Sequence, residues 1–346
     1  MYETNDISLS VLDQIPIRKE GSASDALNET INLAILCESF GYQRYWVAEH
    51  HNSKSFTGNS PEILIAAIAE KTKHIRVGSG GVMLTHYSSL KIAEQFLTLQ
   101  ALHPNRIDLG IGRAPGSDQK TSTALSYPRN QINVEYYPAQ VIDLINYVNN
   151  SLEDNHPFNG VQASADTNTP SSLDIWLLGS SDYSARLAAT LGLPFAFADF
   201  FGDLAHGPIV ADLYRRTFKP SKYLKTPLLT VAVQTLCAPT EEEALFLGSS
   251  RNLNKAGSVM GLNQAFLPPE EAIRYPLTEQ ASQFMKSFRK GYVDGNPKQV
   301  TKNILKIANK YKTNEIAIVT NAYSHEVRIQ SYRLIARAFN LLKSQS

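Results

Sequence analysis

The sequence has few cysteines, almost no net charge and no long hydrophobic run. Its two cysteines, Cys37 and Cys237, lie far apart in a chain of 346 residues, which excludes a disulfide-stapled scaffold and a zinc site built from cysteines. The formal net charge of +1 gives no electrostatic reason to bind nucleic acid or an anionic membrane. No apolar run approaches the length that spans a bilayer, and the N-terminal residues lack the features of a secretion signal. We therefore expect a cytoplasmic protein with no nucleic-acid partner and no membrane partner.

The regular elements alternate between strand and helix. Apolar residues recur at helical spacing between strand-like segments, as at Leu27, Ile31 and Ala34. The eight strand-like segments are residues 7–12, 44–48, 75–83, 106–112, 174–178, 194–199, 228–235 and 315–320. This alternation predicts parallel βαβ units, which can close into a (β/α)8 TIM barrel or remain an open, doubly wound sheet. No G-x-G-x-x-G follows the first strand, which weakens the open dinucleotide-binding fold but does not decide closure.

The strand at residues 106–112 favours the barrel. Its apolar residues Ile107, Leu109 and Ile111 share one face, and the other face carries polar residues and glycines. In a barrel the apolar face would meet the helices, and the small, polar face would point to the interior. The alternative is an edge strand with one face in solvent.

Residues 249–297 interrupt the alternation. They contain glycine-centred turns, a pair of prolines and no clear strand, and they exceed an ordinary strand-to-helix connection. We predict a single barrel domain over residues 1–346, with 249–297 as a lid-like insertion before the last strand.

Glu49, His50 and His51 close the second predicted strand. The carboxyl ends of barrel strands are where TIM barrels place catalytic groups, and histidine is the natural proton donor or acceptor near neutral pH. Adjacent strand residues point to opposite faces, so these three side chains cannot all bind one metal ion, and we predict no metal site. The alternative to a functional histidine here is a hydrogen-bonded structural pair.

Glycines and hydroxyls follow three other strands. The run Gly78–Gly81 fits a bulge, a close approach of backbone to a flat ligand, or a flexible turn. Arg113 follows the fourth strand, and Gly179, Ser180 and Ser181 join the fifth strand to a helix. A glycine, hydroxyls, helix N–H groups and an arginine together have the chemistry of a phosphate site. Alone, the serine-rich loop would be no more than a helix N-cap.

At these residues the sequence resembles the bacterial luciferase-like flavin monooxygenases. The resemblance includes FGYQRYWVAEHHN, IRVGSGGVMLTHYSSLKIAEQFLTL, RIDLGIGRAPGSDQ and WLLGSSDYSARLAATLGLPFAFADF, and it is poorest over 249–297. It implies a TIM barrel that uses FMN, commonly reduced FMN from a separate flavin reductase, with O2 as co-substrate. A C4a-hydroperoxide of the flavin would then oxygenate a small organic substrate. The resemblance also implies a homodimer formed through helices that follow the early strands.

The resemblance assigns residues to the flavin ring. His50 is similar to the luciferase histidine that lies beside the isoalloxazine and assists the chemistry. Gly80 and Gly81 match the pair whose non-proline cis peptide forms a bulge under the ring. Gly112 stands where luciferase has a cysteine near the flavin C4a atom, so this face of the ring would be less filled.

The resemblance also assigns residues to the cofactor phosphate. Arg113 matches the phosphate-binding arginine, and Gly179, Ser180 and Ser181 match a second phosphate loop. Luciferase has an acidic residue in place of Gly179, so the hydrogen bonds to the phosphate would be rearranged.

Two other functions remain open. The superfamily includes reductases that transfer hydride with a deazaflavin coenzyme, and it includes relatives that keep the barrel without catalysis, as a non-catalytic flavin-binding protein would. Nothing of the aldehyde-binding side of luciferase can be matched, so light emission is not predicted.

Overall fold

Eight parallel strands form the centre of the computed structural model, which describes residues 1–114, 118–128, 130, 132–164, 173–202 and 205–342. The strands are β1 (Ser8–Asp13), β2 (Arg44–Val47), β3 (Arg76–Ser79), β5 (Ile107–Gly112), β6 (Asp174–Gly179), β7 (Phe195–Ala198), β8 (Leu229–Cys237) and β10 (Glu315–Val319). Each coincides with a segment that the sequence predicts to be a strand. The third segment differs in detail, because β3 stops before Gly80 and Gly81, and the short β4 (Val82–Met83) follows them.

The last strand closes the sheet. Glu315 of β10 lies opposite Ser8 of β1 on one side and opposite Thr230 of β8 on the other, and both pairings are parallel. The strand order therefore runs β1, β2, β3, β5, β6, β7, β8, β10 and returns to β1. The prediction of a (β/α)8 TIM barrel is confirmed, and the open sheet is excluded.

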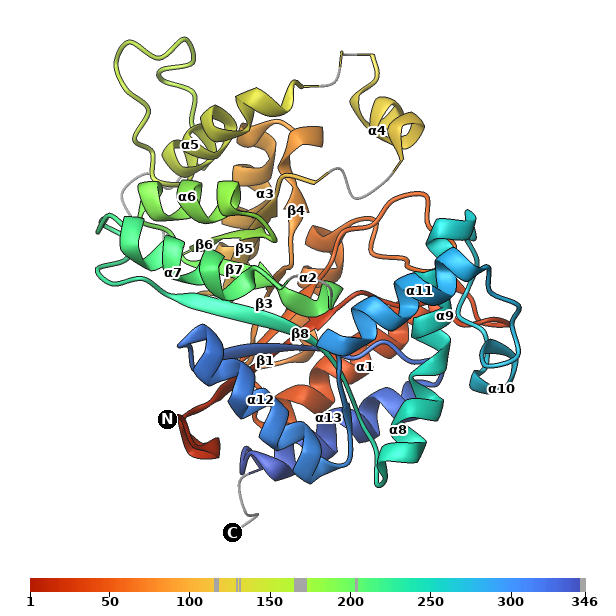
Figure 1. Ribbon diagram of the computed structural model, residues 1–346. Helices are drawn as coiled ribbons and strands as arrows, with labels where there is room; N and C mark the ends of the chain where they lie inside the picture. Colours follow the sequence, from red (N-terminus) through yellow and green to blue (C-terminus); the bar gives the residue numbers. More distant parts are fainter. Residues whose placement is uncertain (115–117, 129, 131, 165–172, 203–204, 343–346) are drawn as a thin grey trace.

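Helices surround the barrel on its outside (Figure 1). The helices that follow the barrel strands are α1 (Ala23–Phe40), α2 (Pro61–Lys71), α3 (Ser89–Leu102), α4 (Gln119–Ser126), α5 (Tyr137–Val148), α6 (Asp182–Leu191), α7 (Gly207–Thr217), α12 (Pro297–Tyr311) and α13 (His325–Ala338). Gly41 ends α1 and Gly192 ends α6 in the left-handed conformation, at φ 90° and 65°, which glycine adopts without the steric cost that a Cβ brings.

The two faces of β5 pack as the sequence predicts. Ile107, Leu109 and Ile111 are fully buried in the hydrophobic cluster shared with the surrounding helices. β5 pairs with β3 on one side and β6 on the other, so it is not an edge strand. The alternate residues Asp108 and Gly110 are left for the barrel interior.

A charged layer fills the amino-terminal part of that interior. Asp108 is fully buried, and its carboxylate accepts hydrogen bonds from Arg44 at 2.7 Å, Arg76 at 2.5 Å and the Trp46 indole N–H at 2.9 Å. Trp46, Gly78 and Asp108 lie opposite one another across β2, β3 and β5. A Cβ at Gly78 would lie 2.6 Å from the Asp108 Cβ. A glycine is therefore required for the carboxylate to occupy this space.

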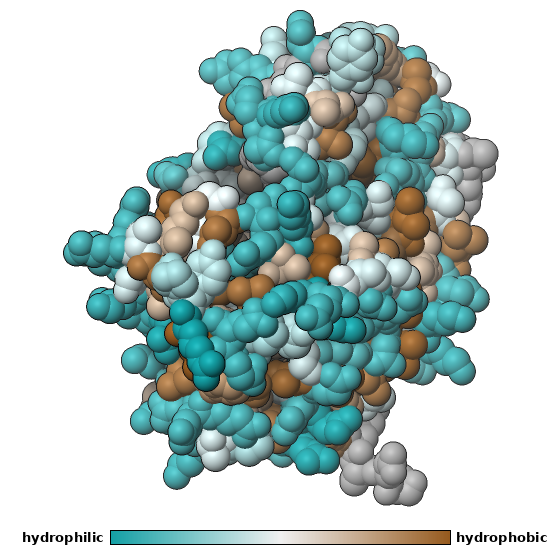
Figure 2. Space-filling model, turned by 90° about the vertical axis from the view of Figure 1, so that its right-hand side faces the viewer, coloured by the Kyte–Doolittle hydropathy of each residue, from teal (hydrophilic) through white to brown (hydrophobic). Residues whose placement is uncertain are grey.

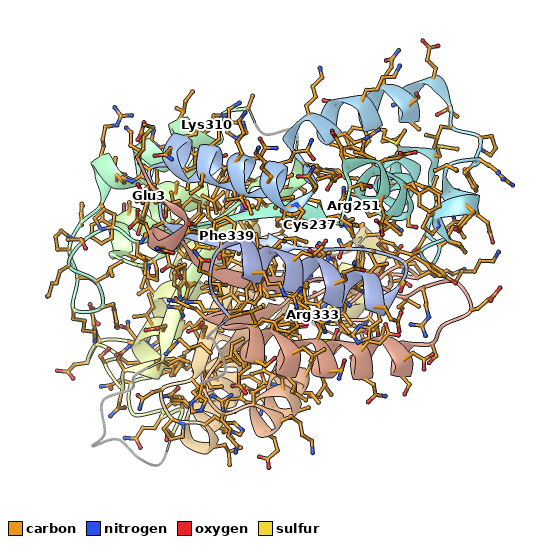
Figure 3. All side chains as sticks on the ribbon, turned by 90° about the horizontal axis from the view of Figure 1, so that it is seen from below. Glu3, Cys237, Arg251, Lys310, Arg333 and Phe339 are labelled. Carbon is orange, nitrogen blue, oxygen red and sulfur yellow. The ribbon has the colours of Figure 1, made fainter. Side chains whose placement is uncertain are left out.

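A second buried ion pair joins the ends of the chain. Arg328 of α13 donates to Asp13 of β1 at 2.5 Å, and the Tyr45 hydroxyl donates to the same carboxylate at 2.6 Å. Figure 3, seen from below, shows α13 lying between α1 and α12. The closing helix is thus held to the first strand by a satisfied buried charge pair as well as by packing.

The insertion lies between β8 and α12. The helix α8 (Glu241–Leu247) follows β8 and precedes the insertion. Residues 249–297 contain α9 (Ser249–Gly257), α10 (Pro269–Ala272), α11 (Glu279–Phe288) and the short β9 (Val293–Gly295). The expectation of no strand in 249–297 is wrong for β9, which pairs in parallel with the last three residues of β8. A strand of three residues is too short to be recognised from a hydrophobic pattern. β9 is a strand because it pairs with the end of β8. Figure 2 shows the face of the molecule on the insertion side, where hydrophobic residues are interspersed among hydrophilic ones.

The charged layer leads to a stability prediction. Asp108→Asn keeps the size of the side chain but leaves Arg44 and Arg76 in the interior without their central negative charge, so the free energy of unfolding should fall by about 3–5 kcal/mol. Asp174→Asn is the matched control, because the Asp174 side chain pairs with the same Arg76 at 2.8 Å but is 50% exposed, and it should cost less than about 1 kcal/mol. Urea denaturation of both variants measures the difference, and equal losses would contradict the role given to Asp108.

Candidate active site

A cavity of about 260 Å³ opens at the carboxyl ends of the barrel strands. Every barrel strand, or the residue directly after it, contributes to the lining. In strand order these residues include Leu12, Trp46, Gly80, Gly81, Gly112, Leu178, Gly179, Ala196, Thr230 and Ala317. This is the end at which TIM-barrel enzymes hold their substrates.

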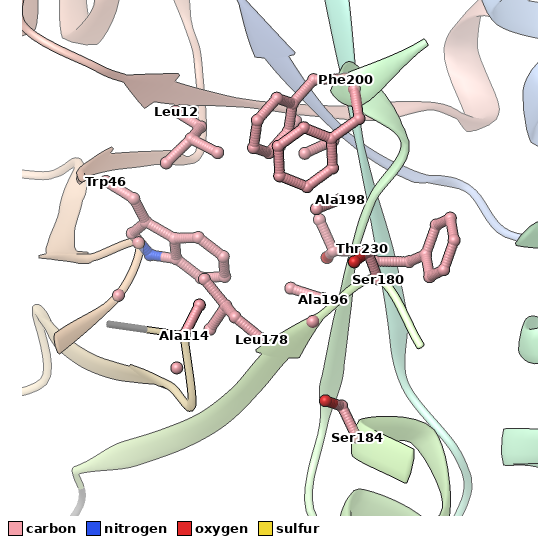
Figure 4. Close-up of a pocket in the computed structure, with 18 of the residues that line it drawn as sticks. Leu12, Trp46, Ala114, Leu178, Ser180, Ser184, Ala196, Ala198, Phe200 and Thr230 are labelled. Carbon is pink, nitrogen blue, oxygen red and sulfur yellow. The ribbon is translucent and has the colours of Figure 1, made fainter. Parts of the chain in front are cut away.

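The cavity walls are mostly apolar. Figure 4 shows Leu12 and Trp46 facing Ala198 and Phe200 across the space. Phe200 belongs to the short helix η4 (Asp199–Phe201), which follows β7 directly. Among the described lining residues, Arg113 is the only charged one.

Backbone forms the wall between β3 and β4. The peptide that joins Gly80 to Gly81 is cis, the geometry that the resemblance implies, and both residues line the cavity. A Cβ at Gly81 would lie 2.7 Å from the carbonyl oxygen of Gly110, and one at Gly80 would overlap the Leu12 side chain. Close packing against the neighbouring strands therefore requires glycine at both positions.

The cavity end beside α6 has the chemistry of an anion site. The Arg113 guanidinium lies 4.4 Å from the ring centroid of Tyr183 in the first turn of α6, and it has no ion pair with any carboxylate of the described residues. Ser181, the N-cap residue, makes no side-chain capping bond, so the first N–H groups of α6 are open to a ligand. A Cβ at Gly179 would overlap the Ser184 hydroxyl. The glycine thus lets this serine approach the loop.

The surroundings of Gly112 are more open. The nearest atom to a Cβ built there is the Met83 sulfur at 3.5 Å, which is an ordinary van der Waals contact. The position differs from Gly81 in this respect, because a Cβ fits at Gly112 without moving backbone.

His50 lies outside the cavity lining. Its imidazole stacks on Phe56, with ring centroids 4.8 Å apart and planes 24° apart, and its Nδ1 atom is buried with no hydrogen-bond partner among the described residues. Burial lowers the pKa of His50 to about 4, although the Glu49 carboxylate acts in the opposite direction, so the ring is neutral at pH 7. The structure brings the other seven predicted site residues to one cavity and places His50 apart from them.

Glu49 forms a hydrogen-bonded group behind the cavity wall. Its carboxylate is 1% exposed and accepts from the Met83 N–H at 2.9 Å and the Tyr87 hydroxyl at 2.8 Å, while His51 Nε2 lies 2.7 Å away. Glu49 and His51 are thus the hydrogen-bonded structural pair that the sequence leaves open as an alternative. His50 takes no part in this pair. Within the described residues, no three His, Cys, Asp or Glu side chains are grouped in a way that could hold a metal ion.

Several lining residues carry no sequence signal for function. Leu12, Trp46 and Leu178 are apolar residues within predicted strands, as core residues commonly are. Phe200 and Phe201 directly follow the predicted strand at residues 194–199. Their common feature is position, since each lies at or just after the carboxyl end of a barrel strand. Counting from the predicted strand ends would have selected them, whereas residue type could not.

A family model described as luciferase-like monooxygenase matches residues 7–322. The chain belongs to the luciferase-like monooxygenase family. It is 43% identical to the uncharacterized protein YwcH of Bacillus subtilis over 96% of this chain and 99% of that protein. It is 35% identical to a luciferase-like monooxygenase of Escherichia coli over 95% and 96% of the two chains. It is 34% identical to the N-acetyl-S-alkylcysteine monooxygenase of Bacillus subtilis over 96% and 98%.

Solved structures share the fold of this chain. Apo-MsnO8 superposes with a TM-score of 0.87 at 35% identity, covering 97% of this chain and 99% of that chain. The oxygenating constituent of a Pseudomonas putida 3,6-diketocamphane monooxygenase, solved with FMN, has a TM-score of 0.67 at 19% identity, covering 96% and 97%. A secondary alcohol dehydrogenase in complex with an adduct of coenzyme F420 and acetone has a TM-score of 0.65 at 14% identity, covering 98% and 99%. The latter two share the fold. Among the described residues, no helix of this luciferase-like monooxygenase is both long and apolar enough to cross a membrane.

The glycine contacts lead to a second prediction. Gly112→Ala should change the free energy of unfolding of this luciferase-like monooxygenase by less than about 1 kcal/mol, because the new Cβ meets only the Met83 sulfur. Gly81→Ala should cost more than about 2 kcal/mol, because its Cβ would press on the backbone of Gly110. Thermal unfolding of the pair measures both, and a stable Gly81→Ala protein would show that the wall is less closely packed than described.

Proposed function

We propose that this luciferase-like monooxygenase uses reduced FMN and O2 to insert one oxygen atom into a small organic substrate. The observation that carries the proposal is a single cavity that joins an anion-binding end, at Arg113 and the first turn of α6, to a larger apolar space. FMN has the same division, with a phosphate at one end and a flat ring system at the other. The relatives named as monooxygenases support the same reaction class.

The hydrogen-bond donors at the Arg113 end of the cavity suit an FMN phosphate. The Arg113 guanidinium has no carboxylate partner among the described residues, and a guanidinium can bind phosphate bidentately. Ser180 and Ser181 add hydroxyls, and the N-terminus of α6 adds N–H groups and the positive end of its dipole. We assign the phosphate to these residues, with Gly179 giving the loop room to approach.

The shape of the other end of the cavity suits the flavin ring. Gly80 and Gly81 present a wall with no side chains, against which a flat ring can lie. Gly112 leaves open space on the same side. We assign the isoalloxazine to this part of the cavity.

When bound, reduced FMN supplies the two electrons with which O2 gives one oxygen atom to the substrate and the other to water. The contribution of the chain is to orient the reactants and to exclude water, for which Leu12, Trp46 and Phe200 provide apolar walls. We propose that neutral His50 acts as the proton-handling group through its Nδ1 atom, which lacks a partner among the described residues.

The insertion supports the proposed shielding. Lys255 of α9 donates a hydrogen bond to the carbonyl of Phe201, and its ammonium lies 4.6 Å from the ring centroid of Phe288. Phe201 lines the cavity, so these contacts attach the insertion to the cavity wall. We propose that residues 249–297 act as a lid-like cover on this side of the site.

The cavity chemistry limits the substrate. With Arg113 assigned to the phosphate, no charged side chain remains among the described lining residues. A charged group deep in such a site would lose its hydration without compensation. We propose that the reacting part of the substrate is neutral and mainly apolar.

Hydride transfer with a deazaflavin coenzyme is the alternative reaction, since a protein of this fold binds coenzyme F420. A third alternative is flavin binding without turnover. Stopped-flow spectroscopy with reduced FMN and, separately, a reduced deazaflavin separates these functions. The proposal expects binding of reduced FMN and its oxidation by O2 with kinetics that differ from those of the free flavin. Binding of the deazaflavin alone, or oxidation identical to that of free flavin, would contradict it.

Two partners belong to the proposal. Reduced FMN must come from an electron donor, for which we propose a separate flavin reductase.

We also propose a homodimer formed through α2 and α3, because Ile63 and Leu102 beside the groove between these helices are 68% and 65% exposed. Light scattering that gives the mass of one chain would contradict the dimer.

The phosphate assignment leads to a third prediction. Arg113→Ala should weaken FMN binding about 10- to 100-fold, because charge-assisted hydrogen bonds to the phosphate are lost. Arg186→Ala on α6 is the matched control, since its side chain is 59% exposed and does not line the cavity. Fluorescence titration with FMN measures both affinities, and equal affinities would overturn the assignment.

A further inference from the structure

Residues 263–266 of the insertion run beside the loop that carries His50. Asn263 accepts a hydrogen bond from the Lys54 N–H at 2.8 Å and donates to the Asn52 carbonyl at 3.2 Å. The Ser55 hydroxyl donates to the Gln264 carbonyl at 2.8 Å. These bonds join segments more than 200 residues apart in sequence.

The end of this segment is anchored to the barrel. The Phe266 N–H donates to the Ile17 carbonyl at 2.8 Å, and the Lys19 N–H donates to the Phe266 carbonyl at 2.7 Å. Phe266 is 1% exposed, so its ring has one fixed place between the barrel and the loop.

Two rings, those of Phe266 and Phe56, lead from this anchor to the imidazole. The Phe266 ring lies 5.6 Å from that of Phe56 at 72°, and the Phe56 ring lies 4.8 Å from that of His50 at 24°. The backbone of His50 is held separately, because its N–H donates to the Gly58 carbonyl at 3.0 Å. The ring stack therefore determines what surrounds the imidazole, whereas the hydrogen bond to Gly58 holds the backbone.

We propose that Phe266 and Phe56 are positioning residues through which the insertion fixes the place and the dry surroundings of the His50 ring. This inference rests on the proposed role of His50 as the proton-handling group. It gives the insertion a second task beside covering the site, since the insertion also positions a side chain in the loop after β2.

The charge state of His50 is the property that the stack would control. The titratable groups that act on the imidazole are Glu49, which favours the charged form, and His51, which opposes it. Burial outweighs both and keeps the ring neutral at pH 7. If water replaces the aromatic rings, the charged form is hydrated again and the pKa returns toward the ordinary value of about 6.5.

Histidine titration by NMR tests the proposal in the protein without cofactor, with His50→Gln identifying the resonance. The His50 midpoint should rise by at least about one pH unit in Phe266→Ala, which means about tenfold more protonated ring at a given pH above the midpoints. Phe266→Leu, which keeps apolar bulk, should restore most of the original midpoint. Phe56→Ala changes a partly exposed ring and should give the same rise if Phe266→Ala fails to fold.

Phe284→Ala is the control within the insertion. Phe284 of α11 packs on Phe288 at 5.2 Å and has no described contact with the His50 loop, so the His50 midpoint should not move. The proposal is overturned if folded Phe266→Ala and Phe56→Ala leave the midpoint within about 0.3 pH unit, or if Phe284→Ala shifts it equally.

The turnover rate as a function of pH separates the two proposals. FMN affinity should stay constant in the Phe266 variants, because Phe266 does not line the cavity. A shifted NMR midpoint with an unchanged pH–rate profile supports the positioning by Phe266 and contradicts the catalytic role of His50. An unshifted midpoint contradicts the positioning, whatever the rate.

Discussion

The buried carboxylate of Asp108 is the group on which the barrel interior depends. An unpaired charge at this depth would be strongly unfavourable, so the carboxylate needs the two arginines and the indole N–H that surround it. These donors come from β2 and β3, which must therefore keep one register against β5. The same requirement removes the side chain at position 78, where any Cβ would overlap the carboxylate residue.

The cavity is built upon this charged layer. Trp46 donates to Asp108 below and lines the cavity above, so the floor of the site is held by the charge network. Higher in the barrel the interior positions carry small residues, among them Ala196, Ala232 and Ala317. These three alanines line the cavity, and their small side chains leave space in the barrel interior. Hydrogen bonds between distant segments join the insertion to the loop that carries His50.

Local patterns predicted much of this arrangement. The alternation in β5 identified its two faces correctly. Arg113 and Ser180 were selected because an arginine and a helix N-terminus after neighbouring strands must meet at the same end of a parallel sheet. The place of His50 could not be predicted in this way, since it depends on Phe266, which is more than 200 residues further along the chain.

The amino-acid sequence by itself determined the eight strand and helix units, the glycines that permit close packing and the side chains available for a phosphate site. These follow from periodicity and from the chemistry of single residues, which are local properties. Only the tertiary structure decided that β10 closes the barrel on β1, that β9 extends β8, and that His50 stacks on Phe56 outside the cavity lining. Each of these depends on contacts between segments far apart in sequence, whose geometry is set by the packing of the whole chain.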